Sequence, residues 1–199
     1  MSLAFHEFRP VSALQVSLLA AQIQRVTDDV QALLLGRPAS DLQACLEPGS
    51  WSVAECLDHL AQTARAFLPA MTDAINAAPR LATNRRLRTG VLAGLFIRNL
   101  EPPYRVRFKV LPQLKPQCQS FEVAWRGFED SQTLLLQTVG SVSGLAIDTV
   151  KIKSPVYARI HYNVYGAIRM LIAHERRHLW QIEHTLRKLD ARRASRSAA

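Results

Sequence analysis

Apolar residues recur at steps of three and four along four stretches of the chain, the spacing that places them on one face of an α-helix. The first stretch covers about residues 11–35 and ends at Gly36 and Pro38, a C-cap glycine followed by a helix breaker. The third and fourth cover about 121–140 and 160–189. The pattern therefore predicts long helices, each with one face directed at a core.

The second stretch has the clearest start. Ser52 and Glu55 have the spacing of a capping box, in which each side chain satisfies a backbone N–H at the helix start. Trp51 precedes the cap, where it could pack onto Cys56, and Pro69 is expected to kink or split the helix. The apolar face of this helix comprises Val53, Leu57, Leu60, Ala61, Ala64, Phe67, Leu68, Met71 and Ile75.

The pattern weakens over 79–118, an irregular crossover that is interrupted by Pro102, Pro103, Pro112 and Pro116 and could hold a short helix within 85–100 and a short strand at 105–111. A loop at 141–155 precedes the fourth helix, and 192–199 is expected to be a frayed basic tail. Four long helices with one extended connection predict an all-α four-helix bundle, a single domain over 1–191 with a crossover between its second and third helices.

Composition narrows the class of protein. The chain has 199 residues and a net charge of +9. Its longest nearly apolar run, 91–97, is far shorter than the roughly 20 residues that a membrane-spanning helix needs. The first residues lack the basic start and apolar core of a secretory signal. An odd count of three cysteines without a Cys-x-x-Cys pair argues against a disulfide framework. We therefore expect a cytoplasmic protein with no membrane partner.

Much of the positive charge falls within 80–115, where Glu101 is the only acidic residue. Clustered positive charge attracts anionic substrates, phosphates or an acidic partner. This segment could make the protein a non-catalytic binding module for nucleic acid or an acidic partner, but few aromatic residues and no nucleic-acid motif accompany the charges. The basic residues are Arg80, Arg85, Arg86, Arg88, Arg98, Arg105, Arg107, Lys109 and Lys115.

Two histidines lie one helical turn apart on the apolar face of the fourth helix. His174 and His178 follow Leu171 by three and seven residues, and their Cβ atoms should be about 5–6 Å apart. Buried, adjacent imidazoles resist protonation because desolvation and mutual repulsion both disfavour the charged form. A shared divalent metal would use the neutral rings as ligands. The alternative is a neutral pair that is hydrogen-bonded to other polar groups in the core.

The same segment matches His-Glu-x-x-His, the motif of zinc proteases. The longer form of that motif has a glycine where this chain has Gln181, and the helical pattern continues through this position. On a continuing helix His184 points about 80° away from His174 and about 120° from His178. The geometry therefore excludes a protease site, and a third ligand must come from another helix.

His59 is the candidate for that third ligand, although the helical wheel places it only at the edge of the polar face. The segment 49–61, Gly-Ser-Trp-Ser-Val-Ala-Glu-Cys-Leu-Asp-His-Leu-Ala, resembles the second-helix start of the DinB/YfiT-like superfamily. The segment 174–182, His-Glu-Arg-Arg-His-Leu-Trp-Gln-Ile, looks like that family's His-x-x-x-His-x-Gly-Gln-Ile, with Trp180 in place of the usual glycine. The order and separation of the two motifs also agree with the family.

The resemblance implies an up-down-down-up bundle in which His59, His174 and His178 hold one zinc or nickel ion, and a bacterial protein with a tendency to form homodimers. It also implies one of two reactions on a small-molecule substrate, which the basic residues suggest is anionic. One is transfer or isomerisation dependent on a low-molecular-weight thiol such as mycothiol or bacillithiol, and the other is hydrolysis. A third possibility is a bundle that binds metal but serves only as an interaction scaffold.

The sequence assigns no general base and leaves the catalytic residues unknown. Glu175 points away from His174 and is expected outside the ligand set or at the surface. Cys56 is interpreted as core packing. The expected solvent-exposed residues are Arg176, Arg177, Arg187, Lys188, His6, His161 and His184.

Overall fold

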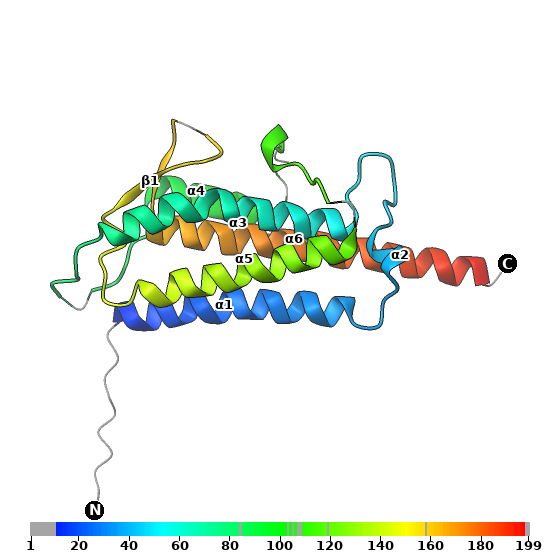
Figure 1. Cartoon of the computed structure of the whole chain (residues 1–199), viewed down its shortest axis with the longest axis horizontal. Coiled ribbons are helices and arrows are strands. Elements are labelled where there is room, and N and C mark those ends of the chain that lie inside the picture. The colour runs from blue at the N-terminus through cyan, green and yellow to red at the C-terminus, as the bar shows by residue number, and fades with distance from the viewer. Residues whose placement is uncertain are drawn as a thin grey trace, which may run out of the picture.

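The structure is a computed structural model that describes residues 11–83, 85–102, 104, 106, 109–118, 120–157 and 159–197. Its body is formed by four long helices (Figure 1): α1 (Val11–Leu34), α3 (Val53–Asn76), α5 (Phe121–Ser141) and α6 (Val164–Ser197). Helices α1 and α6 run in one direction, whereas α3 and α5 run in the other. Each helix packs against two others in the ring α1–α5–α3–α6. The predicted all-α bundle and its up-down-down-up order are confirmed.

Helix α3 shows how the sequence produces these elements. The Ser52 hydroxyl accepts from the Glu55 N–H, and the Glu55 carboxylate accepts from the Ser52 N–H, so the capping box is present. Every residue of the predicted apolar face is buried. The expectation that Pro69 could split the helix is wrong. Pro69 lies on the exposed side, where water can satisfy the Arg65 carbonyl that loses its partner.

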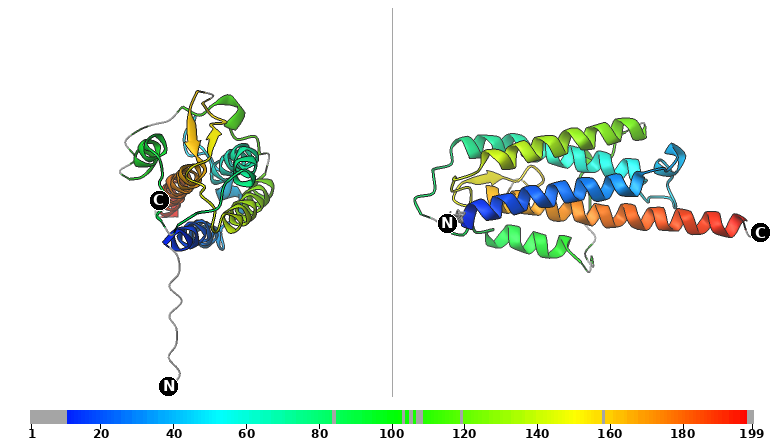
Figure 2. Two further views of the ribbon diagram at one scale, coloured as in Figure 1. Left: turned by 90° about the vertical axis from the view of Figure 1, so that its left-hand side faces the viewer. Right: turned by 90° about the horizontal axis from the view of Figure 1, so that it is seen from below.

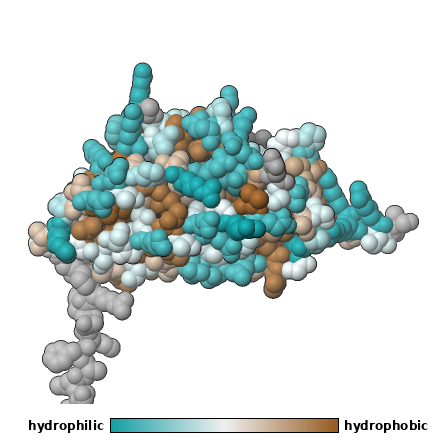
Figure 3. Space-filling model, in the orientation of Figure 1, coloured by the Kyte–Doolittle hydropathy of each residue, from teal (hydrophilic) through white to brown (hydrophobic). Residues whose placement is uncertain are grey.

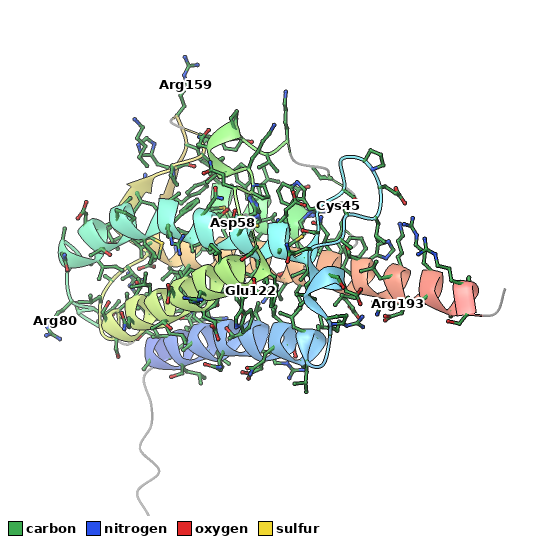
Figure 4. The ribbon with its side chains drawn as sticks, turned by 45° about the vertical axis from the view of Figure 1, so that its right-hand side comes forward. Cys45, Asp58, Arg80, Glu122, Arg159 and Arg193 are labelled. Atoms are coloured by element: carbon green, nitrogen blue, oxygen red, sulfur yellow. The ribbon has the colours of Figure 1, made fainter. Side chains whose placement is uncertain are left out.

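A second layer covers one side of the bundle. It contains α4 (Val91–Leu100), the short helix η1 (Pro112–Leu114) and a hairpin of β1 (Lys151–Lys153) and β2 (His161–Asn163). Figure 2 shows α4 alongside α6, with the hairpin above the bundle and Arg159 projecting from the hairpin loop in Figure 4. The hairpin was not predicted, because strands of three residues are too short to show an alternating pattern.

The crossover departs from the sequence interpretation in detail. Its helix, expected within 85–100, is α4. The strand expected over 105–111 lies partly outside the described residues, and its described residues, Val106 and 109–111, belong to no strand. A turn of helix at Ala39–Leu42, α2, follows α1.

The C-terminal end of α6 corrects another expectation. The helix extends to Ser197 instead of fraying from Arg192, and it projects beyond the bundle (Figure 1). On the visible face, this projecting end is largely hydrophilic (Figure 3). Arg193, labelled in Figure 4, forms an ion pair with Asp41 of α2, and Arg37 forms a bidentate pair with Asp190 at 2.8 and 2.9 Å. These ion pairs hold the last turns of α6 against α2 and the segment that follows α1, beyond the point where the apolar face of α6 ends.

The α5–α6 connection docks the crossover onto the start of α6. The Asn163 side chain accepts from the Gly166 N–H at 2.7 Å and donates to the Arg88 carbonyl at 2.9 Å.

None of the helices in the described chain combines the length and apolarity that crossing a bilayer requires.

Gly166 allows α4 and α6 to approach closely, which generates a prediction. A Cβ at this position would lie 2.3 Å from the Thr89 carbonyl oxygen and 2.7 Å from the Ala93 Cβ. We expect Gly166→Ala to lower the free energy of unfolding by about 1–3 kcal/mol, because backbone must move to relieve the clash. Gly94→Ala is the matched control, since a Cβ there meets no atom within 4 Å. It should raise stability by about 0.5–1 kcal/mol through helix propensity. Urea denaturation of both variants measures the difference, and equal effects would contradict this role of Gly166.

Candidate metal centre

Three histidines meet where α3 faces α6. His59 comes from the second turn of α3, and His174 and His178 from successive turns of α6. The His174 Nε2 lies 3.2 Å from the His59 Nε2 and 3.1 Å from the His178 Nε2. The nitrogens that could act as ligands all lie within 4.8 Å of one another. The structure therefore brings together the three histidines that the sequence nominated.

The crossover fixes the ring of His59. Its Nδ1 is 2.6 Å from the Leu114 carbonyl oxygen. Because a carbonyl can only accept, Nδ1 must carry the proton, and the neutral ring keeps a lone pair on Nε2. This lone pair is on the nitrogen that faces His174. Such a hydrogen bond on the far side of an imidazole is the usual way in which proteins orient a metal-ligating histidine.

Asp58, the neighbour of His59, holds the same segment of the crossover in place. One of its carboxylate oxygens, Oδ2, accepts from the backbone N–H groups of Gln117 and Cys118 at 2.6 and 3.0 Å, and from the Gln62 side chain at 2.8 Å. Asp58 lies on α3 (Figure 4), the helix against which η1 packs. Asp58 thus secures the crossover, and the Leu114 carbonyl of the crossover orients the imidazole of His59. The sequence does not reveal this role, because the backbone partners of Asp58 are about 60 residues away.

Electrostatics keep the three imidazoles neutral. Burial lowers the pKa of His59, although the Leu114 hydrogen bond and Asp58 oppose the shift. The His174 pKa falls to about 3, through desolvation first and then repulsion from His59 and Arg177. Burial and the two neighbouring histidines likewise hold the pKa of His178 well below its usual range. At neutral pH all three rings can present lone pairs.

The donor set fits a metal ion. Ligand nitrogens at about 2.0–2.1 Å from a tetrahedral zinc ion are about 3.3–3.4 Å apart. The His174 Nε2 lies 3.2 Å from the His59 Nε2 and 3.1 Å from the His178 Nε2. Imidazole nitrogens also suit nickel. The His59 and His178 nitrogens lie within 4.8 Å of each other, so the three histidines could hold one divalent ion if these two rings move closer together where needed.

Trp51 covers one side of this cluster. Its ring centroid is 4.8 Å from that of His59, and it stacks on His178 at 5.8 Å with an interplanar angle of 15°. The sequence suggested that this residue could pack onto Cys56. The indole packs against the apolar cluster that contains Cys56, and it also lies over the imidazoles, where it restricts the approach of water.

Two hollows meet at the histidines. One is a chamber of about 120 Å³ walled mainly by apolar side chains, and the other is a wider hollow of about 950 Å³ with a polar rim. Both are lined by His59, Leu100, Lys109, Val110 and His174. A molecule in the wider hollow could therefore reach the three Nε2 atoms and extend past them into the chamber.

The structure corrects the expected environment of several charged residues. Glu175 lies outside the histidine cluster, as expected, but it is not at the surface: it is buried in the bundle, and its Oε1 accepts from the Gln132 side chain at 2.9 Å. Arg177 is not on a solvent-exposed face. It is half-buried, donates to the Asn99 carbonyl and lies over the Tyr104 ring. Arg176 is also half-buried and forms an ion pair with Glu101.

Other candidate residues take no part in the cluster. His161 and His184 are exposed, as are Arg187 and Lys188, whereas His6 lies outside the described residues. Cys56 is buried among apolar side chains, and burial raises the pKa of its thiol. Trp180, which replaces the glycine of the motif, stacks on His184 and contacts Tyr104 at the surface.

Comparison with known proteins gives one match. A family model described as "DinB superfamily" matches residues 22–182, which include all three histidines. Neither the curated proteins nor the solved structures include a match.

The buried carboxyl of Glu175 generates a prediction. Desolvation raises its pKa to about 7, against an ordinary value near 4.5, although the Gln132 hydrogen bond and Arg176 oppose the shift. The folded state therefore binds this proton more tightly than the unfolded state, and stability decreases as the pH rises from about 4.5 to 7. In metal-free protein, Glu175→Gln should raise the free energy of unfolding by on the order of 3 kcal/mol at pH 7.5, because it removes the cost of a buried carboxylate. At pH 4, where the carboxyl is protonated in the folded state, the substitution should have no such effect. Chemical denaturation at both pH values measures it. Glu129→Gln, at an exposed site on α5, is the control, and a pH-independent effect of Glu175→Gln would contradict the shift.

Proposed function

Because the chain belongs to the DinB superfamily, we propose that it is a metal-dependent enzyme in which His59, His174 and His178 bind one zinc or nickel ion. The observation that carries this proposal is the convergence of three neutral imidazoles, with Nε2 atoms 3.1 and 3.2 Å apart, beside two hollows. Three protein ligands are the usual number at catalytic zinc sites, whereas structural sites use four.

The reaction class that we favour is transfer dependent on a low-molecular-weight thiol. A bound divalent ion would lower the pKa of a thiol brought to it, so that the thiolate can attack an electrophile. Within the described chain, no carboxylate belongs to the histidine cluster. Glu175 is hydrogen-bonded to Gln132, and Glu55 is engaged in the cap of α3. Hydrolysis, the second candidate, would benefit from such a carboxylate as a general base.

The chain's own residues supply orientation and shielding. His59 is oriented by the Leu114 carbonyl, and Trp51 shields the cluster on one side. Lys109 and Lys115 line the wider hollow, and among the described residues neither has an ion-pair partner. Their charges would attract an anionic substrate or thiol.

The alternative function, a module that uses the segment 80–115 to bind nucleic acid or an acidic partner, remains a separate hypothesis. The described charges of this segment do not form one surface. Arg85, Arg86 and Arg88 line a groove with α1 and α6, where Arg85 pairs with Asp148, whereas Lys109 and Lys115 face the histidines. A salt-sensitive shift of duplex DNA in a gel would support the alternative.

The test of the metal site is elemental analysis of protein purified without an affinity tag. We expect about one zinc or nickel ion per chain in the unmodified protein, and at least a tenfold loss of affinity in His59→Ala and His178→Ala, because each removes one of three ligands. His184→Ala is the matched control, an exposed histidine on the same helix, and should retain the metal. Metal-free protein that also fails to bind added zinc and nickel would refute the proposal.

A further inference from the structure

The chamber beside the histidines is mainly apolar, and its walls come from the bundle, the crossover and the hairpin. The bundle contributes Phe67, Met170 and Leu171, the crossover contributes Leu114, and the hairpin contributes Tyr162. All five of these side chains are at most 8% exposed.

Two hydroxyl groups of the wall already have hydrogen-bond partners within the protein. The Thr63 hydroxyl donates to the His59 carbonyl at 2.8 Å, and the Tyr162 hydroxyl bonds Ser154. The nitrogen-bearing side chains of the chamber, His59, His174 and Lys109, all line the wider hollow as well. A ligand group inside the chamber would therefore contact hydrocarbon, and it would meet nitrogen only at the end where the two hollows join.

The size of the chamber limits what it can accept. Its volume of about 120 Å³ is somewhat smaller than the apolar cavities of about 150 Å³ that bind benzene. It therefore has room for an alkyl or aryl group of about four to six carbon atoms.

The other side of the histidines has the opposite character. The wider hollow is lined by three cationic side chains, Lys109, Lys115 and Arg177. Its two carboxylates are engaged elsewhere, Glu55 in the cap of α3 and Glu47 with Lys188 at 3.8 Å. The surplus positive charge therefore faces the solvent side of the centre.

We propose that the substrate is an amphipathic anion whose short alkyl or aryl group occupies the chamber, while its anionic group lies in the wider hollow near Lys109. The reacting carbon would then be located between the two hollows, beside the Nε2 atoms. This inference rests on the proposed function for its chemistry, but the binding it describes requires only the protein walls.

The test uses straight-chain carboxylates, from acetate to octanoate, as probes of both metal-loaded and metal-free protein. Each added methylene should raise the affinity about fourfold as it enters the chamber, and the gain should end near hexanoate, when the chamber is full. The protein is labelled with ¹³C-methyl methionine for this experiment, so that the methyl signals in the NMR spectrum report where the probe binds. The methyl signal of Met170, in the chamber wall, should shift with hexanoate and not with acetate, while that of Met71, in the core, should stay unchanged.

Two variants locate the chamber. Val110→Trp places an indole where the hollows join and should abolish the dependence on chain length. Val106→Trp is the matched control, because this exposed valine of the same crossover lines neither hollow. Affinities independent of chain length in the unmodified protein, or a Met170 methyl that hexanoate does not move, would overturn the proposal.

A third variant tests the anionic group. Lys109→Ala should weaken hexanoate binding about two- to fivefold and leave hexan-1-ol binding unchanged. Equal effects on both would refute the charged part of the proposal.

The outcomes also distinguish the proposal of a substrate chamber from the proposal of a metal-dependent enzyme. A dependence on chain length in protein that binds no metal would support the chamber and refute the metalloenzyme. A protein that binds the metal but shows no dependence on chain length would support the metal site and refute the chamber.

Discussion

Three imidazoles, two of them buried and one half-buried, meet at one point and impose the constraint on which the rest of the structure depends. A buried imidazole is tolerated only when it is neutral or paired, and each of these rings has the other two as close neighbours. Their juxtaposition requires α3 and α6 to pack side by side with a fixed register. It also requires a carbonyl opposite His59 to set its tautomer, and the Leu114 carbonyl comes from the crossover rather than from the bundle.

The crossover is therefore a working part of the centre and not merely a connection. Asp58 holds its end against α3, Asn163 holds its beginning against α6, and between these points η1 and residues 109–111 line the chamber beside the histidines. The same segments supply both the apolar wall of the chamber and the lysines of the wider hollow. The bundle provides the reactive nitrogens, whereas the outer layer determines which molecules can reach them.

The features that the sequence predicted are those encoded locally. Helix period, the Ser52–Glu55 cap and the spacing of His174 and His178 each involve residues within one or two turns, and the structure contains all three. His59 was ambiguous because its burial depends on Leu114 and Trp51, which no helical wheel includes. The burial of Glu175 depends in the same way on Gln132, and the hairpin on pairing between strands that the pattern does not show. The chamber, assembled from segments about 100 residues apart, has no sequence signature at all.

The way in which the chamber is walled has an evolutionary consequence. Val110, Leu111, Val156 and Tyr157 line it from irregular segments outside the four long helices. Substitutions at such positions change the shape of the chamber without removing a core contact between the long helices, so they carry little penalty in folding stability. The selectivity of this fold can therefore diverge rapidly among descendants that keep the same three histidines, and preservation of the histidines alone is a poor guide to whether two such proteins share a substrate.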